Sequence, residues 1–467
     1  MAKQRIETVH FIGIGGVGMS GIAHVAHDQG MQVSGSDLKE SRYTLQLKDA
    51  GIAVHIGHDA GNIPAADPDV VVVSTAILEN NPELMAAKAR GLTIWHRAKM
   101  LAALGVDKCT LAVAGTHGKT TTSSMLASTL DAMGQDPSFL IGGIVRAYHT
   151  NAHSGAGLHY VVEADESDKS FTYLDPAAVL VTNIEADHLD HYSDLAEIHQ
   201  LFAEFISSVP KTGAVVICGE DENLMQVARS TGHACISYGF GEAFDVCLSH
   251  YTPVGIGSTF DVVFPDGHQV TAHIPQNPGR HNALNAAGTL ALIWALGLPV
   301  DDAVAALGQF AGVRRRFDLV DTVGGITVVD DYAHHPTEIA ATIAAAKQLD
   351  FKRVHVLFQP HRYSRVKLFT EVLKDEFAAA FDAADSVTFM DVFSAGEAPV
   401  PGVSGKTFMN VVLDHAGHPQ TAYIPRRTDV VPYLVSKLQP HDLLITMGAG
   451  DVTAVGPQVV AALTPDC

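Results

Sequence analysis

The chain has few basic residues for its length, and this scarcity limits its possible partners. Among 467 residues, 30 are Lys or Arg and 51 are Asp or Glu, which gives a formal net charge of −21 at pH 7. Proteins bind nucleic-acid backbones and anionic membranes through clustered Lys and Arg. We therefore expect neither a nucleic acid nor a membrane as a partner. A nucleotide can still be bound, because local backbone dipoles and magnesium can hold its phosphates.

Cysteine is scarce as well. The 5 cysteines are dispersed along the chain with no Cys-x-x-Cys spacing. An odd, dispersed set is typical of reduced thiols in the cytosol and argues against a disulfide framework or a zinc site. No apolar run approaches the ~20 residues that a membrane span needs, and the first apolar stretch is too short for a signal peptide. We expect a cytoplasmic protein.

Charged residues make up only 17% of the chain and hydrophobic residues 47%, which is typical of a well-buried globular protein. The length exceeds what one hydrophobic core usually supports, so two to four domains are expected. Short apolar runs alternate with Ala-rich segments of helical spacing, and this alternation indicates an α/β fold.

The most specific motif is a glycine loop between an expected strand at 111–114 and an expected helix beyond residue 119. Backbone N–H groups at such a loop and at the helix N-terminus point at an anion, and the helix dipole adds to the attraction. Lys119 can reach the outer phosphates of a nucleotide, and the Thr120 hydroxyl can hold magnesium. The residues of the motif are Gly115, Thr116, His117, Gly118, Lys119, Thr120 and Thr121.

This loop departs from the general phosphate-loop pattern in one respect. Five residues before Gly118, where the general motif has glycine, the chain has Val113. The loop is therefore a shortened Gly-x-x-Gly-Lys-Thr. An ordinary glycine-rich turn is the alternative, and the strand and helix expected on either side favour the phosphate loop.

A second glycine loop follows a strand-like run at 9–12. Gly13, Gly15 and Gly18 fit the dinucleotide fingerprint, and a second expected strand ends at Asp37. Taken alone, this pattern indicates an NAD site in which Asp37 holds a ribose hydroxyl. However, any unit that brings a diphosphate onto a helix N-terminus needs the same glycines. We predict a Rossmann-like domain over residues 1–105 that binds a nucleotide diphosphate, with the identity of the cofactor left open.

Acidic residues follow two further strand-like runs, at 161–162 and 179–182. Glu163 begins one acidic segment, and His188 lies within the other. Carboxylates at the carboxyl end of a strand, downstream of a phosphate loop, usually complete a magnesium site. Solvated acidic turns would explain most of the later acids but not Glu163. A histidine among such acids is a candidate ligand, although it can also be a satisfied surface or core residue.

Polar clusters recur toward the C-terminus. Asn282 and Asn285 lie one helical turn apart, a spacing that suits a base or a phosphate edge, whereas Asn at a helix start is more often a cap. The densest basic cluster, at 314–316, marks an expected domain boundary near 311 and is a candidate phosphate clamp. Beyond it, three expected strands each end in polar residues, at the edge where open α/β sheets bind ligands.

Taken together, these motifs closely resemble those of the Mur ligases, the ATP-dependent enzymes that add amino acids to the peptidoglycan precursor. The resemblance covers essentially the whole chain, and several motifs in family order are far more specific than a phosphate loop alone. It implies an α/β fold with three domains: a Rossmann-like N-terminal domain for a UDP-sugar at 1–105, a central P-loop ATPase domain at 106–311, and a Rossmann-like C-terminal domain for the amino acid at 312–467. The motifs are Gly13–Gly21, Gly115–Thr121, Glu163–Asp168, Asp187–Asp190, His281-Asn282, Arg315–Phe317, Asp331–Glu338 and His361–Arg365.

The resemblance also implies roles for individual residues. The first glycine loop would hold the UDP diphosphate rather than NAD, with Asp37 and His58 facing the uridine. Lys119, His188 and Arg316 would be the catalytic residues. The other implied residues are Gly15, Gly16, Gly18, Met19, Ser20 and Ser74 for the UDP-sugar; the phosphate loop with Asn282, Arg316 (or Arg315 as the alternative clamp) and Asp331 for ATP; Tyr332, His334, Arg362 and Arg365 for the amino acid; and Thr120, Glu163 and His188 for magnesium.

Within the family, the residues at 166–168 and 187–190 favour the member that joins L-alanine to UDP-N-acetylmuramate through an acyl phosphate, using ATP and two Mg²⁺ ions. A member that recycles whole peptides onto UDP-N-acetylmuramate is the alternative. An oxidoreductase would leave the Gly-Lys-Thr loop unused, and a nucleotide switch would need no amino-acid pocket. We expect a monomer or a homodimer, in which the third domain closes over the second and keeps water from the acyl phosphate.

One departure from the family generates a prediction. Several Mur ligases hold their second magnesium with a carbamylated lysine some way after the Asp-x-His segment, but no lysine occurs between Asp187 and Pro210. We expect phosphate release to be the same in bicarbonate-depleted and bicarbonate-supplemented buffer. A carbamate adduct seen by mass spectrometry, or rescue by bicarbonate at low pH, would contradict this expectation.

Overall fold

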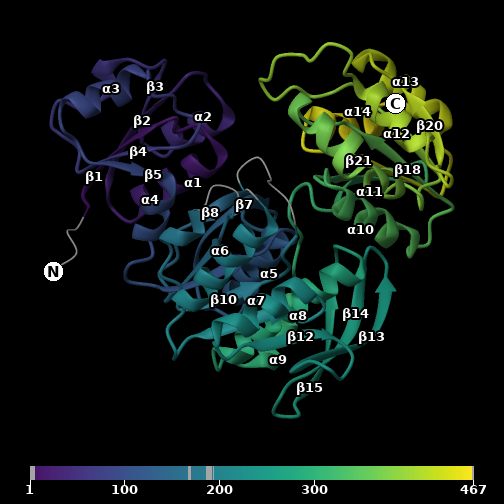
Figure 1. Cartoon of the computed structure of the whole chain (residues 1–467), viewed down its shortest axis with the longest axis horizontal. Helices are drawn as coiled ribbons and strands as arrows, with labels where there is room; N and C mark the ends of the chain where they lie inside the picture. The colour runs from purple at the N-terminus through teal and green to yellow at the C-terminus, as the bar shows by residue number, and fades with distance from the viewer. Residues whose placement is uncertain (1–5, 167–169, 186–191, 193, 465–467) are drawn as a thin grey trace. The chain divides into compact units, whose positions relative to one another are not determined.

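The computed structural model describes residues 6–166, 170–185, 192 and 194–464 of the chain. The chain forms two compact units. The first comprises Met1–Leu248, Val262–Val270 and Asn285–Leu307, and the second comprises Ser249–Asp261, Thr271–Leu284 and Gly308–Cys467. The strands form three sheets, and Figure 1 labels some strands of each. None of the helices that the structure describes is long and apolar enough to cross a membrane.

The first sheet is a parallel five-stranded sheet with the order β3-β2-β1-β4-β5. Its central strand β1 is almost entirely buried, as expected for a parallel strand covered on both faces. The strand order reverses between β1 and β4, which is the position where doubly wound sheets bind ligands at their carboxyl edge. The elements are β1 Thr8–Ile12, α1 Val17–Asp28, β2 Gln32–Asp37, α2 Arg42–Asp49, β3 Ala53–Ile56, η1 Ala60–Asn62, β4 Val70–Val73, α3 Pro82–Ala89, β5 Ile94–His96 and α4 Arg97–Ala103.

The second sheet has the order β15-β14-β13-β12-β11-β10-β6-β9-β7-β8. From β13 to β7 the strands pair in parallel, and β8 runs antiparallel to β7. The boundary between the two units passes through β13, β14, β15 and α8. The elements are β6 Cys109–Ala114, α5 Lys119–Ala132, β7 Ser138–Val145, β8 Thr150–His153, β9 His159–Glu163, η2 Ser170–Tyr173, β10 Ala178–Val181, α6 Leu195–Ser208, β11 Ala214–Cys218, α7 Glu222–Thr231, β12 Ile236–Phe240, β13 Val246–Val254, β14 Gly257–Val263, β15 Gln269–Ile274, α8 Arg280–Ala295 and α9 Val300–Leu307.

The third sheet has the order β16-β17-β21-β18-β19-β20, with β16 antiparallel to β17 and the other pairs parallel. Its core is aromatic on one side, where the ring of Phe358 lies 5.9 Å from that of Phe377 and 5.3 Å from that of Phe381. The elements are β16 Asp318–Val323, β17 Ile326–Asp331, α10 Pro336–Lys347, β18 Arg353–Phe358, η3 Tyr363–Arg365, η4 Leu368–Val372, α11 Lys374–Ala379, β19 Ser386–Phe389, α12 Gly405–Leu413, β20 Gln420–Tyr423, α13 Arg427–Lys437, β21 Asp442–Met447, η5 Asp451–Ala454 and α14 Val455–Leu463.

These sheets confirm the expected α/β fold class, with a Rossmann-like sheet on either side of the central sheet in sequence. The strands expected at 9–12 and 111–114 are present as β1 and β6, and the helix expected beyond residue 119 is α5. The domain boundaries at 105/106 and 311/312 stay predictions.

A buried carboxylate connects several parts of the first sheet. Glu83, at the start of α3, has a side chain that is 0% exposed. Its Oε2 accepts hydrogen bonds from His10 Nε2 (3.0 Å) and Ser36 Oγ (2.8 Å). Its Oε1 lies 2.9 Å from His58 Nδ1 and 3.1 Å from Asn62 Nδ2. Burial opposes ionisation of Glu83, but these hydrogen bonds outweigh it and lower the pKa to about 2. We call these five residues the Glu83 cluster.

The first and third sheets contain similar buried histidines. His10 Nδ1 lies 2.9 Å from Ser34 Oγ, while its Nε2 meets Glu83. In the third sheet, His355 Nδ1 lies 2.7 Å from Ser386 Oγ, and its Nε2 lies 3.2 Å from an Asp442 oxygen. In each case the serine is the register partner of the histidine on the neighbouring parallel strand. Both nitrogens of each buried ring therefore have a partner.

The Glu83 cluster predicts a specific sensitivity to acid. The pKa of Glu83 falls from an ordinary 4.5 to about 2, so its ionisation stabilises the folded protein above pH 4.5, and this contribution is lost as the pH falls toward 2. At full strength the contribution is about 3 kcal/mol. Between about pH 5 and about pH 3, the free energy of unfolding measured in urea should fall less in Glu83→Gln than in the wild type. An equal fall in both proteins would contradict this role.

Candidate active site

The phosphate loop lies between β6 and α5, in the first unit. Gly115 and Gly118 both have left-handed backbone angles, with φ of +130° and +84°, and Gly118 caps the helix. A Cβ on Gly115 would lie 2.1 Å from Thr182 Oγ1, at the end of β10, so only glycine fits at this position. The N-terminus of α5 therefore opens directly from a tight turn, which is the geometry of an anion-binding loop.

Hydrogen bonds to the segment after β10 fix the conformation of this loop. The Thr116 N–H donates to the Asn183 carbonyl (3.0 Å), and the His117 N–H donates to Asn183 Oδ1 (2.8 Å). In return, the His117 carbonyl accepts from Thr182 Oγ1 (2.6 Å). A Cβ on Gly118 would lie 2.9 Å from Asn285 Oδ1, so this amide of α8 lies beside the loop. The loop is thus pre-formed by the protein itself.

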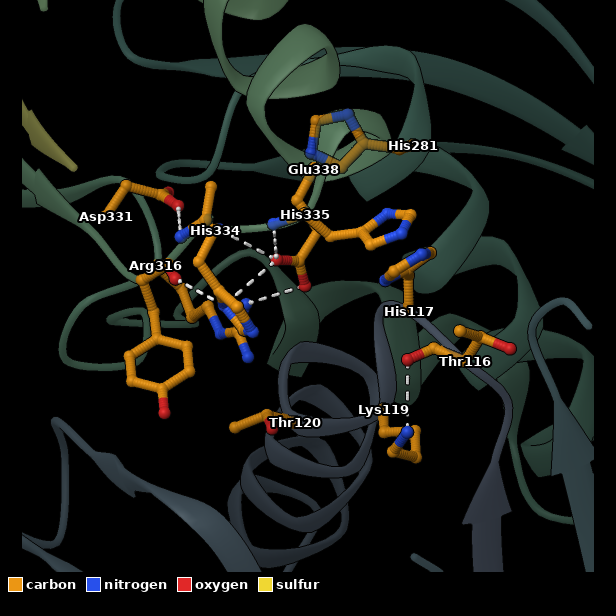
Figure 2. Close-up of polar contacts among 12 residues, drawn as sticks. Thr116, His117, Lys119, Thr120, His281, Arg316, Asp331, His334, His335 and Glu338 are labelled. Carbon is orange, nitrogen blue, oxygen red and sulfur yellow. Dashed lines mark hydrogen bonds and ion pairs between the residues drawn. The ribbon is translucent and has the colours of Figure 1, made fainter. Parts of the chain in front are cut away.

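Lys119 is held over the loop by a carboxylate. Its Nζ donates to Glu166 Oε1 (2.9 Å) and Oε2 (2.8 Å) and to the carbonyls of Gly115 (2.5 Å) and Thr116 (3.1 Å), the last of which Figure 2 shows. The side chain is only 12% exposed. Burial alone would lower the pKa of Lys119, but the nearby carboxylates, Glu166 first, raise it overall. Lys119 is therefore a fixed positive charge at the start of α5.

The Thr120 hydroxyl and the Glu163 carboxylate form a second polar contact at the start of α5. Thr120 Oγ1 donates to Glu163 Oε1 over 3.0 Å, and Glu163 Oε2 accepts the Gly142 N–H over 2.6 Å. Glu163 is the last residue of β9, as the sequence predicts. A threonine hydroxyl and a carboxylate at this spacing are the hard oxygen donors that Mg²⁺ prefers, so these two residues fit the ion. His188, the candidate ligand of a second ion, lies outside the described residues.

The N-terminal glycine loop is organised by Asp37. Asp37 Oδ2 accepts the Gly15 N–H over 2.9 Å, and a Cβ on Gly15 would lie 2.9 Å from the same oxygen. Gly16 caps α1, at the carboxyl edge of the first sheet. Met19 and Ser20 are both buried, at 3% and 5% exposure. The other residues predicted to bind the UDP-sugar are Gly18, His58 and Ser74, which also lie at this edge.

In the second unit, Asp331 organises the segment that carries the basic cluster. Its oxygens accept the Phe317 N–H (2.7 Å) and the Ala333 N–H (2.8 Å). Burial raises the pKa of Asp331 to about 6 against the opposing effect of Arg316. Arg315 and Phe317 both have positive φ, of 63° and 48°, a strained conformation for residues with side chains. The Asp331 carboxylate, predicted to contact ATP, therefore also fixes this turn.

The two arginines of this turn have different surroundings. The Arg315 guanidinium donates to the carbonyls of Gly448 (2.5 Å) and Gly450 (3.2 Å). Its hydrogen bonds therefore hold together loops of the third sheet. Arg316 Nη1 lies 3.7 Å from Glu338 Oε1, an ion pair that Figure 2 draws. Both guanidinium groups lie over the Tyr332 ring, with their carbons 4.8 Å (Arg315) and 5.3 Å (Arg316) from its centre. This arrangement favours Arg316 over Arg315 as a phosphate clamp.

The residues predicted to bind the amino acid surround His361. The rings of Tyr332 and His334 lie 5.2 Å apart, and those of His334 and His361 lie 6.4 Å apart. Burial, together with the positive charges of His334, Arg365 and Arg362, lowers the pKa of His361 to about 4. Arg362 precedes the 3₁₀ turn that contains Arg365 and has a φ of 67°. These cations therefore gather at the carboxyl end of β18.

The Asn282 side chain contacts residues at the start of its own helix, α8. Its Nδ2 donates to the Pro278 carbonyl over 2.9 Å and lies 3.0 Å from His281 Nε2. Burial lowers the pKa of His281 to about 4, so the ring is neutral at pH 7. The predicted contact between Asn282 and ATP stays a prediction.

Sequence reasoning missed three side chains of these sites. Glu166 reaches back 47 residues to Lys119. Glu397 accepts hydrogen bonds from the Ser364 N–H (2.9 Å) and hydroxyl (2.6 Å), and the Arg362 charge helps to lower its pKa. His361 completes the set. Glu166 and His361 lie inside motifs noted in the sequence, but their spacing does not indicate their partners, and nothing in the sequence marks Glu397.

Comparison with known families and proteins agrees with this geometry. Three family models match the chain in order: "Mur ligase family, catalytic domain" over residues 8–108, "Mur ligase middle domain" over 113–293, and "Mur ligase, glutamate ligase domain" over 315–450. The chain is 44% identical to UDP-N-acetylmuramate–L-alanine ligase of Thermobifida fusca, over 98% of this chain and 97% of that protein. It is 43% identical to the Bradyrhizobium enzyme of the same name, over 96% of each chain.

Solved structures show the same architecture. A UDP-N-acetylmuramate–alanine ligase from Thermotoga maritima superposes with a TM-score of 0.80 and 28% identity, covering 98% of this chain and 99% of that one. A murein peptide ligase from Psychrobacter arcticus has a TM-score of 0.69 and 25% identity, covering 99% of each. A MurF ligase from Thermotoga maritima in complex with ADP shares the fold at 16% identity, with a TM-score of 0.62 over 92% of this chain and 93% of that one. With three successive family models and relatives of this identity over nearly its whole length, the chain belongs to the Mur ligase family.

Proposed function

We propose that the protein ligates L-alanine to the lactyl carboxylate of UDP-N-acetylmuramate, with ATP converted to ADP and phosphate, in peptidoglycan precursor synthesis. The observation that carries this proposal is the identity of 40–44% over at least 96% of the chain to proteins that bear this activity in their names. The phosphate loop with Lys119 and the separate glycine loop at Asp37 supply the two nucleotide sites that such a reaction needs.

The reaction divides into two steps. The lactyl carboxylate attacks the γ-phosphorus of ATP, ADP leaves, and an acyl phosphate forms. The amino group of L-alanine then attacks the acyl carbon, phosphate leaves, and the amide results after loss of a proton. Lys119 and Arg316 would neutralise the phosphoryl oxygens, because charge on both reactants otherwise opposes the first step.

When bound, magnesium would supply further positive charge against the phosphate oxygens. Thr120 and Glu163 are the residues proposed to hold one ion, and His188 is proposed to hold a second. The phosphate loop would bind ATP with Asn282 and Asp331, and the first glycine loop would bind the UDP diphosphate. We further propose domains at 1–105, 106–311 and 312–467, a cytoplasmic enzyme, and a monomer or homodimer.

Arg362 and Arg365 are proposed to hold the carboxylate of the amino acid. A planar guanidinium binds a carboxylate through two parallel hydrogen bonds, which Lys cannot do. The positive charge that gathers around His361 supports this placement. Tyr332 and His334 would line the same pocket.

A ligase that attaches whole peptides to UDP-N-acetylmuramate is the second candidate, supported by the fold shared with the murein peptide ligase of Psychrobacter arcticus. Phosphate release with UDP-N-acetylmuramate and either L-alanine, glycine, L-serine or a tripeptide separates the two. We expect L-alanine to give the highest kcat/KM. A tripeptide that exceeds L-alanine would favour the second candidate, and phosphate release that depends on none of the four compounds would contradict both.

The proposed reaction predicts a large effect of replacing Lys119. Lys119→Met should lower kcat by at least ~10³, because a charge-stabilising group in a phosphoryl-transfer site is worth a few kcal/mol. The single variant leaves Glu166 buried without its partner, so the double variant Lys119→Met/Glu166→Gln controls for stability. Near-normal turnover in either variant, with a melting temperature close to that of the wild type, would contradict the assignment.

The proposed carboxylate site predicts an effect of replacing Arg365. Arg365→Lys should raise the KM for L-alanine by about tenfold or more, as expected when a bidentate charged pair is lost. The KM for ATP should stay nearly constant. Arg426→Lys, an exposed arginine before α13, is the matched control and should change neither value. Equal shifts for both substrates in Arg365→Lys, or no shift, would place the carboxylate site elsewhere.

A further inference from the structure

The protein itself uses all the hydrogen-bond donors of the Lys119 ammonium group. A lysine ammonium has three N–H donors. Lys119 Nζ lies 2.5 Å from the Gly115 carbonyl, 3.1 Å from the Thr116 carbonyl, and 2.9 and 2.8 Å from the two Glu166 oxygens. With one hydrogen on each carbonyl, the third is shared between the two carboxylate oxygens. A phosphate oxygen that binds Lys119 must therefore take the place of one of these partners.

Glu166 is the partner that can leave. The two carbonyls belong to the backbone of the phosphate loop, which hydrogen bonds to Asn183 hold in place. The Glu166 carboxylate instead ends a side chain with rotatable bonds. The Tyr192 hydroxyl donates to the Glu166 carbonyl, which anchors the backbone of this residue and not its carboxylate. Lys119 can thus stay on the loop while the Glu166 side chain rotates away.

The charge of Glu166 also favours this exchange. The Glu166 side chain is 5% exposed and that of Lys119 is 12% exposed, so solvent screens the pair only weakly. A phosphate beside the Glu166 carboxylate would place two anions in this buried position, which costs free energy unless one of them leaves. Both Glu166 oxygens face the ammonium group, as two oxygens of a phosphate can. The carboxylate and a phosphate therefore suit the same position.

We propose that Glu166 competes with the nucleotide phosphate for Lys119: its carboxylate leaves the ammonium group when ATP binds and returns to it as ADP leaves. This proposal rests on the proposed binding of ATP at the phosphate loop. The competition keeps the buried ammonium group paired at every stage, weakens nucleotide binding and speeds the release of ADP. A carboxylate that only positions Lys119 has the opposite effect on affinity, because its removal weakens nucleotide binding.

Calorimetric titration of the full-length protein with ADP, in the presence of Mg²⁺, tests the proposal. Glu166→Gln should bind ADP about tenfold or more tightly than the wild type, because one charge-assisted hydrogen bond is lost from the state that excludes the phosphate. The rate at which a fluorescent ADP analogue dissociates, measured by stopped flow, should fall in the same variant. A dissociation rate that rises would overturn the proposal.

Asp165→Asn is the matched control, because it removes the same charge from the neighbouring residue. The charge of Asp165 helps that of Glu166 to raise the pKa of Lys119 against the effect of burial. The Asp165 carboxylate, however, pairs with Arg97, whose Nη2 lies 3.7 Å from Oδ2. Asp165→Asn should change the Kd for ADP by about threefold or less, the effect of a partly exposed charge.

A second comparison removes the group for which Glu166 competes. In a Lys119→Met background, Glu166→Gln should change the Kd for ADP by no more than the same factor of about threefold, because only its charge then acts on the phosphate. A tenfold gain that persists without Lys119 would show that Glu166 repels the phosphate directly, and the proposal would be wrong.

If Glu166→Gln does not fold, a crystal structure of the wild-type protein with ADP decides the question. Lys119 Nζ should then contact a phosphate oxygen and the two loop carbonyls, with both Glu166 oxygens more than about 4 Å from it, beyond the range of an ion pair. Glu166 still paired with Lys119 in that complex would overturn the proposal.

The remaining outcomes distinguish the inference from the function on which it rests. Weaker binding of ADP by Glu166→Gln would mean that Glu166 positions Lys119, and an unchanged Kd would mean that carboxylate and phosphate do not compete. Either result overturns the proposal but leaves the ATP site intact. Wild-type protein that binds neither ADP nor ATP would overturn the proposed function itself.

Discussion

The contact between the phosphate loop and the end of β10 is the constraint on which the catalytic centre depends. Because Gly115 has no Cβ, the loop can lie against Thr182 and exchange hydrogen bonds with Asn183. This contact fixes where α5 begins, and the position of α5 in turn fixes Lys119 and Thr120 relative to the carboxylates at the end of β9 and just beyond it. Three neighbouring strands of one sheet thus contribute to a single cluster of charges, and the register of those strands determines its geometry.

Much of this arrangement could be predicted from the sequence, because each strand is a short apolar run and the polar residues follow it directly. Glu163 at the end of β9 and Lys119 at the start of α5 are examples. The pairing of side chains could not be predicted. Glu166 reaches Lys119 across 47 residues through the packing of adjacent strands, and a local pattern contains no such information. Similarly, Met19 lies within a recognisable motif, but its burial depends on how α1 packs on the sheet.

The Asp331 side chain has two roles: it is predicted to contact ATP, and it fixes the turn that contains Arg315 and Phe317. Its two oxygens hold the backbone on either side of the turn that contains Arg315 and Phe317, and the positive φ values there are tolerated because these bonds offset the strain. The same carboxyl is buried enough for its pKa to rise to about 6. Contact with a nucleotide alone would not explain why this carboxyl is both buried and hydrogen-bonded to the backbone of the turn. The need to shape the segment that leads to Arg316 explains both.

His10 in the first sheet and His355 in the third sheet are buried in similar surroundings, and this has a consequence for chemical footprinting of the protein. Reagents that acylate imidazole attack a free nitrogen lone pair, and each of these rings has both nitrogens engaged by a serine and a carboxylate below the surface. In a chain with 25 histidines, these two act as internal standards that stay unmodified while the sheets are intact. Their labelling would therefore report the opening of the first or the third sheet separately, without any introduced probe.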